Sequence, residues 1–280
     1  MPGIRVITDS ACDLPPALAE QKDIDIVPLT IRFGDEELVD RRDLTPKEFW
    51  ARCATSPVLP ETAAPSPGAF EEAYRRAASL GAEGVVCVSL SSGLSATYQS
   101  AVLAADSVKD TIEVRVVDSR SLTMGEGMMA VAAADVAAAG GDINAVVAAV
   151  EDMIPQQRTY AALDTLENLK KGGRIGAAQA MVGSMLSIKP IIEVTKGMVE
   201  SESKQRTRSK SLRYLVDKVK EHPNIEYLAV MHGDAPDIDE FVDMLTAVVD
   251  TSKMIVGDIG AVIGTHGGPR TVGVTFSISK

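Results

Sequence analysis

Cysteine is scarce in this chain, and it forms neither a metal-binding nor a disulfide pattern. The three cysteines, Cys12, Cys53 and Cys87, are widely spaced and make no paired motif. Structural zinc sites and disulfide frameworks both need several cysteines at characteristic spacing. The three histidines likewise show no metal-ligand spacing. We therefore expect no metal site and no disulfide framework.

The glycine patterns that hold nucleotide phosphates are also missing. The sequence has no Gly-x-x-x-x-Gly-Lys-Ser/Thr motif, and the glycines from Gly257 to Gly268 do not follow the spacing of dinucleotide-binding loops. We expect no cofactor, so that any bound molecule is a ligand.

Basic residues are too few for a nucleic-acid-binding face. The formal net charge is −11, and the one basic cluster runs from Lys204 to Arg213. Nucleic-acid binding needs a sustained basic surface, whereas a short basic cluster is more typical of a solvated helix face. We expect no nucleic-acid partner. In so acidic a chain, an anion site has to be local, made by a few hydroxyls, amides or arginines.

Long apolar runs are absent as well. The longest, from Met128 to Gly140, contains Asp135 and is too short and too rich in alanine to span a bilayer. The first residues, Met1 to Ile7, lack the apolar stretch of a secretory signal. The expected location is the cytoplasm.

What the chain does contain is a regular alternation of apolar runs and helical periods. Ile4–Thr8, Gly84–Ser89 and Val114–Asp118 have the character of buried strands, with helical segments between them. Such β-α-β-α alternation is typical of a parallel sheet covered on both faces by helices. The pattern of strand-like and helical segments changes after Pro155, so we predict one α/β domain over residues 1–156 and a second over 157–280.

A serine-rich turn, from Ser89 to Thr97, follows one of these strands and leads into a helix. Such a turn directs backbone amides and short hydroxyls to one spot, where the helix dipole also favours negative charge. In α/β sheets, ligands usually bind at the carboxyl ends of the strands. We predict a small anion site here, and helix capping by Ser91 or Ser92 is the simpler alternative.

Two other strands end in similar residues. Thr8-Asp9-Ser10 follows the first strand, and Asp118-Ser119 ends the strand that begins at Val114. Three strands that end in hydroxyl or carboxylate side chains fit a common cleft. For Asp9, ligand binding and a capping or turn role both remain open.

A serine hydrolase or acyltransferase is an alternative function for the serine-rich turn. Gly93-Leu94-Ser95-Ala96-Thr97 matches half of a nucleophile elbow, which needs a second glycine where Thr97 stands. Ser92 or Ser95 would be the nucleophile and His266 the base, but the elbow is incomplete. A protein that senses a sugar or a phosphate with the same turn is a third alternative.

Groups that could hold the acidic end of a ligand occur in two glycine-containing segments and one basic segment. His266 stands between glycines in Gly264-Thr265-His266-Gly267-Gly268, where the backbone can approach a ligand closely and an imidazole can pair with a carboxylate. Arg174 follows Gly172-Gly173, a sequence that also fits a plain helix stop. Arg206 is a further candidate, with a solvated helix start as its alternative.

Five motifs, taken in their order along the chain, resemble those of the DegV family. They are Thr8-Asp9-Ser10, the loop from Thr62 to Pro67, the segment from Leu90 to Ser100 that ends in Tyr-Gln-Ser, Lys171-Gly172-Gly173-Arg174-Ile175, and the loop from Gly264 to Gly268. The resemblance covers essentially the whole chain, and the ordered set is far more specific than any one motif.

This resemblance implies a two-domain α/β fold, with an N-terminal parallel sheet covered by helices and a C-terminal domain with a mixed sheet. It implies that the protein binds a long-chain fatty acid in an interdomain cleft and has no catalysis of its own. Bacterial relatives act as the binding subunit of fatty acid kinase, which presents the acyl carboxylate to a separate ATP-using subunit. The implied partners are the fatty acid and that kinase subunit, with transient contact to membranes.

The resemblance also assigns residues to the carboxylate end of the fatty acid: Thr62, Ser91, Ser92, Ser95, Arg174, Arg206 and His266. Thr62 and Ser92 match the hydroxyl residues that bond the carboxylate, and Ser91 and Ser95 lie beside Ser92. Ala63-Ala64 and Ala96 depart from the residues that the family often has at those positions, although neither change removes a carboxylate donor.

A fatty acid needs a long apolar slot with one polar end. Burial of its chain supplies most of the affinity, at about 0.8 kcal/mol per methylene. Met181 and Met185 could line such a slot, because methionine adapts to flexible chains. Ordinary core packing explains these methionines equally well.

Overall fold

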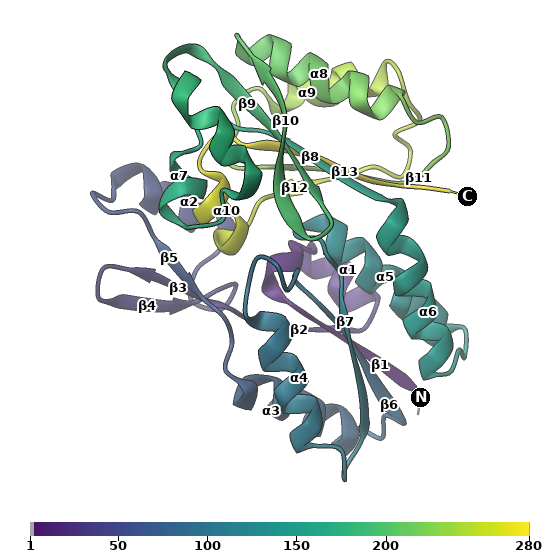
Figure 1. Cartoon of the computed structure of the whole chain (residues 1–280). Coiled ribbons are helices and arrows are strands. Elements are labelled where there is room, and N and C mark those ends of the chain that lie inside the picture. Colours follow the sequence, from purple (N-terminus) through teal and green to yellow (C-terminus); the bar gives the residue numbers. More distant parts are fainter. Residues whose placement is uncertain (1–2, 280) are drawn as a thin grey trace.

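Three β-sheets organise the described part of the chain (Figure 1). In the computed structural model, the backbone is described over residues 3–279 and the side chains over residues 3–181 and 188–279. A four-stranded parallel sheet comes from the first half of the chain and a six-stranded mixed sheet from the second half. A small three-stranded sheet projects beside them.

The parallel sheet has the strand order β2-β1-β6-β7. Its strands are β1 (Ile4–Asp9), β2 (Ile24–Val27), β6 (Gly84–Ser89) and β7 (Glu113–Asp118). The helices around it are α1 (Pro16–Gln21), α3 (Pro67–Ser79), α4 (Thr97–Ser107), α5 (Met124–Ala138) and α6 (Ile143–Met153). Phe70 and Ala101, from α3 and α4, pack against one face, and Met128 and Val146, from α5 and α6, pack against the other. The predicted parallel sheet with helices on both faces is confirmed.

The six-stranded sheet has the order β10-β9-β8-β13-β11-β12. Its strands are β8 (Gln157–Ala162), β9 (Lys189–Thr195), β10 (Met198–Gln205), β11 (Ile225–His232), β12 (Ile255–Asp258) and β13 (Val272–Ile278). Only β11 and β12 run parallel within this described sheet, so it is mixed, as expected. Helices α8 (Arg208–Lys220) and α9 (Ile238–Thr246) bury one of its faces through residues such as Leu215 and Phe241 (Figure 1).

The three-stranded sheet has the order β4-β3-β5. Strands β3 (Thr30–Phe33) and β4 (Glu36–Val39) form the hairpin that Gly34-Asp35 predicts. Helix α2 (Pro46–Thr55) begins with a capping box, which Thr45-Pro46-Lys47-Glu48 predicts and in which Thr45 and Glu48 satisfy each other's backbone amides. Strand β5 (Glu61–Ala63) lies in a segment expected to be a loop, because its pairing with β3 is long-range.

Two short helices, α7 (Glu167–Lys171) and α10 (Ala261–Gly267), lie between the sheets. The sequence suggested a glycine loop around His266, and that interpretation is wrong, because His266 lies in the last turn of α10. The glycine at Gly264 serves close packing. A Cβ there would lie 2.7 Å from the ring of Trp50 and 2.8 Å from that of Phe49.

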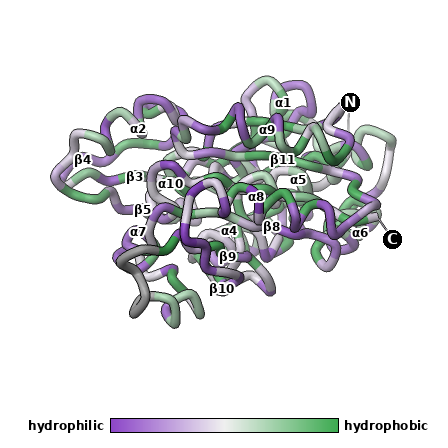
Figure 2. Tube along the Cα trace, turned by 90° about the horizontal axis from the view of Figure 1, so that it is seen from above, coloured by the Kyte–Doolittle hydropathy of each residue, from purple (hydrophilic) through white to green (hydrophobic). Residues whose placement is uncertain are grey.

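The remaining short elements are the 3₁₀ turns η1 (Ser10–Cys12), η2 (Ile154–Gln156) and η3 (Gly176–Ser187). The change of sheet coincides with the predicted boundary, because β7 ends at Asp118 and β8 begins at Gln157. One apolar core nevertheless contains Val6 of β1 and Met231 of β11 together. In Figure 2 the largely hydrophobic β11 runs through the middle of the molecule. The division into two domains stays a prediction.

Candidate functional site

An apolar cavity lies where the loops that follow the parallel strands meet the six-stranded sheet. It holds about 910 Å³ of space free of protein atoms, its mouth included. Leu90 follows β6 and Leu122 follows β7, while Ile192 and Val194 come from β9. Its other apolar walls are Leu29, Leu94, Tyr160, Ala161, Leu163, Leu169, Val199, Met231, Ile259, Val262, Ile263 and Val274.

Polar side chains able to meet a ligand gather at one end of this cavity. Thr62, Arg174 and His266 line both the cavity and a second, shallower hollow of about 700 Å³. We call this second hollow the vestibule. Its remaining lining is Leu59, Pro60, Glu61, Asn168, Lys171, Gly172 and Thr265. We call Thr62, Arg174 and His266 the threshold. The apolar cavity therefore opens past the polar threshold into a polar vestibule.

The other threonines on the cavity wall are satisfied by protein groups. Thr123 donates to Asp13 over 2.7 Å, and Thr271 donates to the carbonyl of Gly267 over 2.8 Å. Thr159 and Thr275 bond to each other. A buried hydroxyl that already has a partner offers little to a second one. Because these other threonines are already paired, the threshold is the polar end of the cavity.

His266 and Thr62 form the centre of the threshold. Thr62 Oγ1 lies 3.1 Å from His266 Nε2. Loss of water around the half-buried imidazole lowers the pKa of His266 to about 4, and the nearby charge of Arg174 acts in the same direction. The ring is therefore neutral at pH 7.

The environment of Nδ1 decides which nitrogen of His266 carries the proton. Nδ1 is buried without a hydrogen-bond partner among the described residues. Gly172 leaves it room, since a Cβ at that position would lie 2.2 Å from Nδ1. A buried lone pair costs less to leave unpaired than a buried N–H, so we assign the proton to Nε2. Nε2–H then donates to Thr62 Oγ1, and the Thr62 hydroxyl keeps its own proton for a ligand.

Arg174 supplies the positive charge of the threshold. Its Nε donates to the carbonyl of Leu94 over 3.0 Å, and its Nη1 donates to that of Gly172 over 2.7 Å. Gly173, at φ +71°, ends α7 and turns the chain so that the arginine faces the cavity. The helix stop and the directed arginine, posed as alternatives by the sequence, occur together.

Ser95 is the serine of the predicted turn that reaches the cavity wall. Its Oγ lies 2.8 Å from Thr97 Oγ1 and accepts the Thr97 amide over 3.3 Å, at the start of α4. Neither Ser91 nor Ser92 caps this helix. We assign Thr97 as the donor of that hydroxyl bond, so that Ser95 only accepts from Thr97 and keeps its own proton for the space that it shares with Thr62 and His266.

Ser91 and Ser92 do not line the cavity. Buried Ser91 donates to the carbonyl of Gly197 over 2.7 Å, which fixes the turn to the β9–β10 hairpin. Exposed Ser92 donates to Asp118 over 2.5 Å, and its amide donates to the same carboxylate over 3.1 Å. The protein's own carboxylate thus occupies donors that the sequence assigned to a ligand. The geometry moves the expected hydroxyl partner from Ser92 to Ser95.

The structure brings Thr62, Ser95, Arg174 and His266 together, and it leaves Arg206 apart. Arg206 is exposed between β10 and α8 and lines neither the cavity nor the vestibule. Met181 is buried beside the cavity, in one cluster with Leu163 and Leu169, and is not on its wall. The side chain of Met185 lies outside the described residues.

The arrangement does not assemble a serine nucleophile with its base. Ser92 is bonded to Asp118 and Ser95 to Thr97, while the partner of His266 is Thr62. Among the described residues, no group of three or more His, Cys, Asp or Glu side chains could hold a metal ion. In the same part of the chain, no helix is long and apolar enough to cross a membrane.

Sequence reasoning missed the walls of the cavity. Leu29, Ile259 and Val262 line it, but each belongs to a short apolar run that equally fits an ordinary core. Apolar pattern shows that a residue is buried, not whether it faces protein or an open slot.

Fold and cavity together define a class of α/β proteins in which a parallel and a mixed sheet enclose an apolar chamber with one polar end. The family model described as "Uncharacterised protein, DegV family" matches residues 3–279. A DegV domain-containing protein of Streptomyces coelicolor is 37% identical, with 98% of each chain covered. The chain belongs to the DegV family, as the resemblance of its motifs indicated.

Solved structures agree with this membership. A DegV family protein from Thermus thermophilus, described by its fatty acid binding, superposes with a TM-score of 0.91 at 30% identity, over 99% of this chain and 100% of that one. DegV from Bacillus subtilis, described as a fatty acid binding protein, gives a TM-score of 0.89 at 29% identity, over 100% of both chains. The expected fold class is confirmed.

Proposed function

We propose that this protein binds a long-chain fatty acid, with the acyl chain in the cavity and the carboxylate at the threshold. The carboxylate accepts hydrogen bonds from Thr62 and Ser95, and Arg174 supplies the opposite charge. His266 orients the Thr62 hydroxyl. Ser91 acts through the shape of the turn that carries Ser95, whereas Ser92 bonds to Asp118 and takes no part in binding.

The observation that carries this proposal is the separation of polarity along one continuous cavity. Apolar side chains from both sheets form its walls, and the polar groups that remain available gather where it meets the vestibule. A fatty acid has the same division. Burial of its methylenes contributes about 0.8 kcal/mol each, and hydrogen bonds to the charged carboxylate add about 1.5–3 kcal/mol each. The fatty acid binding named for the Thermus thermophilus and Bacillus subtilis proteins supports the same assignment.

We further propose that the protein does not transform the fatty acid but presents it to a separate, ATP-using kinase subunit in the cytoplasm. The vestibule supports this role, because it would give a second protein access to a carboxylate whose tail stays buried. Lys171 and Arg174 face it with positive charge, which suits a phosphoryl group. Exposed Arg206 is a candidate contact for such a partner. Transient contact with a membrane would load or unload the acyl chain.

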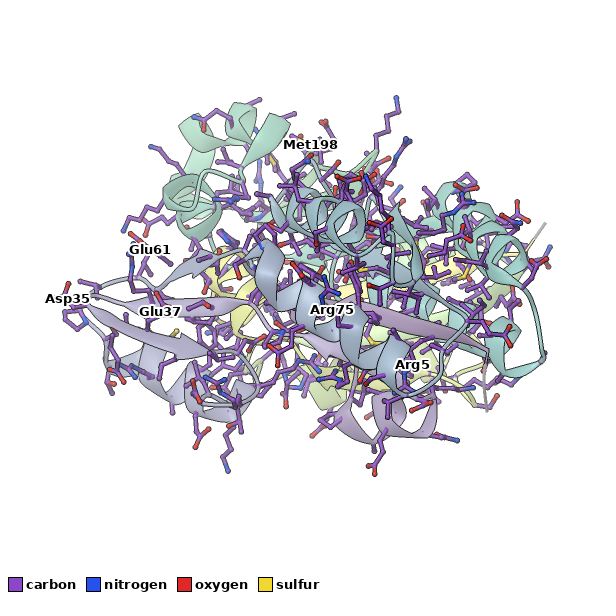
Figure 3. The ribbon with its side chains drawn as sticks, turned by 90° about the horizontal axis from the view of Figure 1, so that it is seen from below. Arg5, Asp35, Glu37, Glu61, Arg75 and Met198 are labelled. Atoms are coloured by element: carbon purple, nitrogen blue, oxygen red, sulfur yellow. The ribbon has the colours of Figure 1, made fainter. Side chains whose placement is uncertain are left out.

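The charge around the vestibule is not uniform. Glu61 borders it, and Figure 3 shows Asp35, Glu37 and Glu61 together on the projecting three-stranded sheet. Glu61 also pairs with Arg32. A partner that docks here meets an acidic sheet on one side and Lys171 and Arg174 on the other, so the docking orientation is fixed by charge.

Mass spectrometry of an organic extract of the purified protein tests the binding proposal. We expect close to one fatty acid per chain. A serine hydrolase would instead be labelled by a fluorophosphonate at Ser92 or Ser95. Absence of lipid together with such labelling would overturn the proposal in favour of hydrolysis.

A further inference from the structure

Buried acidic groups gather at the end of β1, outside the cavity. Asp9, Asp13 and Glu126 are all buried, with Glu126 reaching in from the first turn of α5. Thr8 and Ser10 are buried beside them. We call these five residues the β1 cluster. Burial of several carboxyl groups is costly unless they are paired or protonated, so the cluster calls for an explanation.

The first part of the β1 cluster holds two segments of the cavity wall. Asp9 Oδ2 accepts the amide of Leu90 over 2.9 Å and the hydroxyl of Ser89 over 3.2 Å. Ser10 Oγ accepts the amide of Leu29 over 3.0 Å. Leu90 and Leu29 both line the cavity, and Leu90 opens the turn that carries Ser95.

Asp13 holds two further wall segments. Its Oδ2 accepts the hydroxyl of Thr123 over 2.7 Å, and its Oδ1 accepts the amide of Gly260 over 2.9 Å. Thr123 lines the cavity, and Gly260 follows Ile259, which lines it too. Gly260 also begins α10, the helix of His266. Four separate wall segments are thus tied to one short stretch of chain.

The hydrogen bonds of Glu126 locate a proton within the β1 cluster. Its Oε1 accepts the Thr8 hydroxyl over 2.8 Å, whereas its Oε2 is buried with no partner among the described residues. Asp9, which directly follows the Thr8 that bonds to Glu126, already accepts three donors, from Ala11, Ser89 and Leu90. Its negative charge is therefore better stabilised by hydrogen bonds than a charge on Glu126 would be. A proton on Glu126 Oε2 would let that unpaired oxygen donate to Asp9.

We propose that Glu126 is a carboxylic acid that donates its proton to Asp9, and that this pair is a positioning device for the turn that carries Ser95. The pair does not touch the ligand. It holds the Leu90 amide, and through it the wall and threshold, in the binding arrangement. The effect on affinity rests on the proposed fatty acid binding, whereas the shared proton does not.

Titration of the pair makes the wall sensitive to alkaline pH. Burial, followed by the charge of Asp9, raises the pKa of Glu126 well above its usual value, and burial raises the pKa of Asp9 to about 6. The groups that face them are Asp13, the thiols of Cys12 and Cys87, the hydroxyl of Tyr74 and the cation of Arg41. Loss of the proton places two negative charges in contact, so the arrangement weakens as pH rises.

Two substitutions of opposite consequence test the proposal. Glu126→Gln keeps an N–H donor toward Asp9 and cannot titrate. Asp9→Asn replaces an oxygen that accepts by an amide that donates. The matched control is Asp135→Asn, on the same helix α5 but at the surface, where Asp135 pairs with Lys22.

The first measurement is made on ligand-free protein. Near pH 7, the infrared difference between wild type and Glu126→Gln should show the C=O stretch of a protonated carboxylic acid, and Asp135→Asn should leave that band in place. Burial raises the pKa of Asp13 to about 7, so Asp13 contributes a band of its own that is common to wild type and variant and cancels in the difference. Absence of that band in the wild type would overturn the shared proton, whatever the protein binds.

The second measurement is oleate affinity against pH. We expect wild-type and Asp135→Asn affinity to fall about tenfold as rising pH removes the shared proton. Over the same pH range we expect Glu126→Gln to change by less than about twofold, and Asp9→Asn to bind about tenfold more weakly throughout. Parallel profiles for wild type and Glu126→Gln would overturn the positioning role. Absence of oleate binding at every pH would instead overturn the proposed function, and the infrared band would still decide the proton.

Discussion

His266 contributes to the site as a neutral donor and not as a charge. Its imidazole has lost water and faces Arg174, so it resists protonation. A cation at this position would repel Arg174. A neutral ring with Nε2–H toward Thr62 instead fixes the direction of the threonine hydroxyl, 3.1 Å away. The positive charge of the site is then left to Arg174, which cannot lose it.

The hydroxyl groups of the threshold give the first prediction. We expect Thr62→Ala and Ser95→Ala each to reduce oleate affinity by about 1.5–3 kcal/mol, roughly tenfold or more, because each removes a hydrogen bond to a charged group. Isothermal titration calorimetry measures the change. Ser92→Ala is the matched control and should leave affinity within about twofold, since Ser92 bonds to Asp118. A larger loss for Ser92→Ala than for Ser95→Ala would show that the carboxylate lies elsewhere.

Acid sensitivity of His266 gives the second prediction. Its folded-state pKa of about 4 lies below the ordinary histidine value of 6.5, so the unfolded chain takes up a proton first. The stability that this histidine contributes is present above pH 6.5 and is lost as pH falls toward 4. His266→Gln keeps an N–H donor without titrating. Melting temperatures of the two proteins should therefore diverge on acidification, with the wild type losing more. Curves that stay parallel would contradict the lowered pKa.

Residue identities at the threshold could be predicted only in part. Thr62, Arg174 and His266 came from the resemblance of motifs, and the structure places them together. Ser92 was favoured over Ser95 because the resemblance matches Ser92 to the serine of the family's carboxylate site. Local sequence cannot show that Asp118, on another strand, engages Ser92, so the choice between neighbouring serines depends on tertiary contacts.

At the scale of elements, α7 and α10 hold the threshold through close backbone packing. Gly172, at the end of α7, has an ordinary φ of −76°, yet a Cβ there would lie 2.2 Å from His266 Nδ1. Asn168 of α7 donates to the carbonyl of Thr265 in α10 over 3.1 Å. The two helices therefore act as one support for the imidazole.

Gly172→Ala gives the third prediction. Replacement of glycine by alanine at an ordinary φ usually stabilises a protein by about 0.4–1 kcal/mol, because it restricts the unfolded chain. Here the added methyl must displace His266, so we expect lower stability and at least roughly tenfold weaker oleate binding. Gly68→Ala, in α3, is the control and should be neutral or stabilising, because an added Cβ there would lie 3.7 Å from Ser66 Oγ, an ordinary contact distance. Chemical denaturation and calorimetry report both effects. Equal stability and equal oleate affinity of the two variants would show that Gly172 does not help to position His266.

Elements with strong local signals could be predicted closely. Thr45 to Glu48 has the sequence of a capping box, and Val272 to Ile278 alternates between apolar and polar residues as a strand does. The structure contains both elements. Strand β5 and helix α10 were missed for physical reasons. Glu61–Ala63 becomes a strand only by pairing with β3, and α10 contains glycines that weaken local helix propensity but allow contact with Phe49 and Trp50.

At the scale of the whole molecule, the cavity joins segments that are far apart in the sequence. Leu29, Leu94 and Val194 line one space, although they come from three different parts of the chain. A ligand that fills this space contacts both sheets at once. It therefore stabilises the folded molecule as a whole, by an amount that depends on its concentration and affinity.

Ligand-dependent stability gives the fourth prediction. Oleate at a hundredfold excess over its Kd should stabilise delipidated protein by about 2.7 kcal/mol and raise its Tm by about 5 °C. The Thr62→Ala/Ser95→Ala double variant should show a much smaller rise at the same oleate concentration. Differential scanning calorimetry gives both values. Equal rises in the two proteins would mean that oleate acts without using the threshold.

A crystal structure of the protein with oleate tests the central claim most directly. We expect the carboxylate within hydrogen-bond distance of Thr62 Oγ1 and Ser95 Oγ, beside Arg174, with the acyl chain between Leu90 and Ile192 on opposing walls of the cavity. Density for the carboxylate beside Ser92 and Asp118, or a cavity that stays empty while oleate binds elsewhere, would contradict the account.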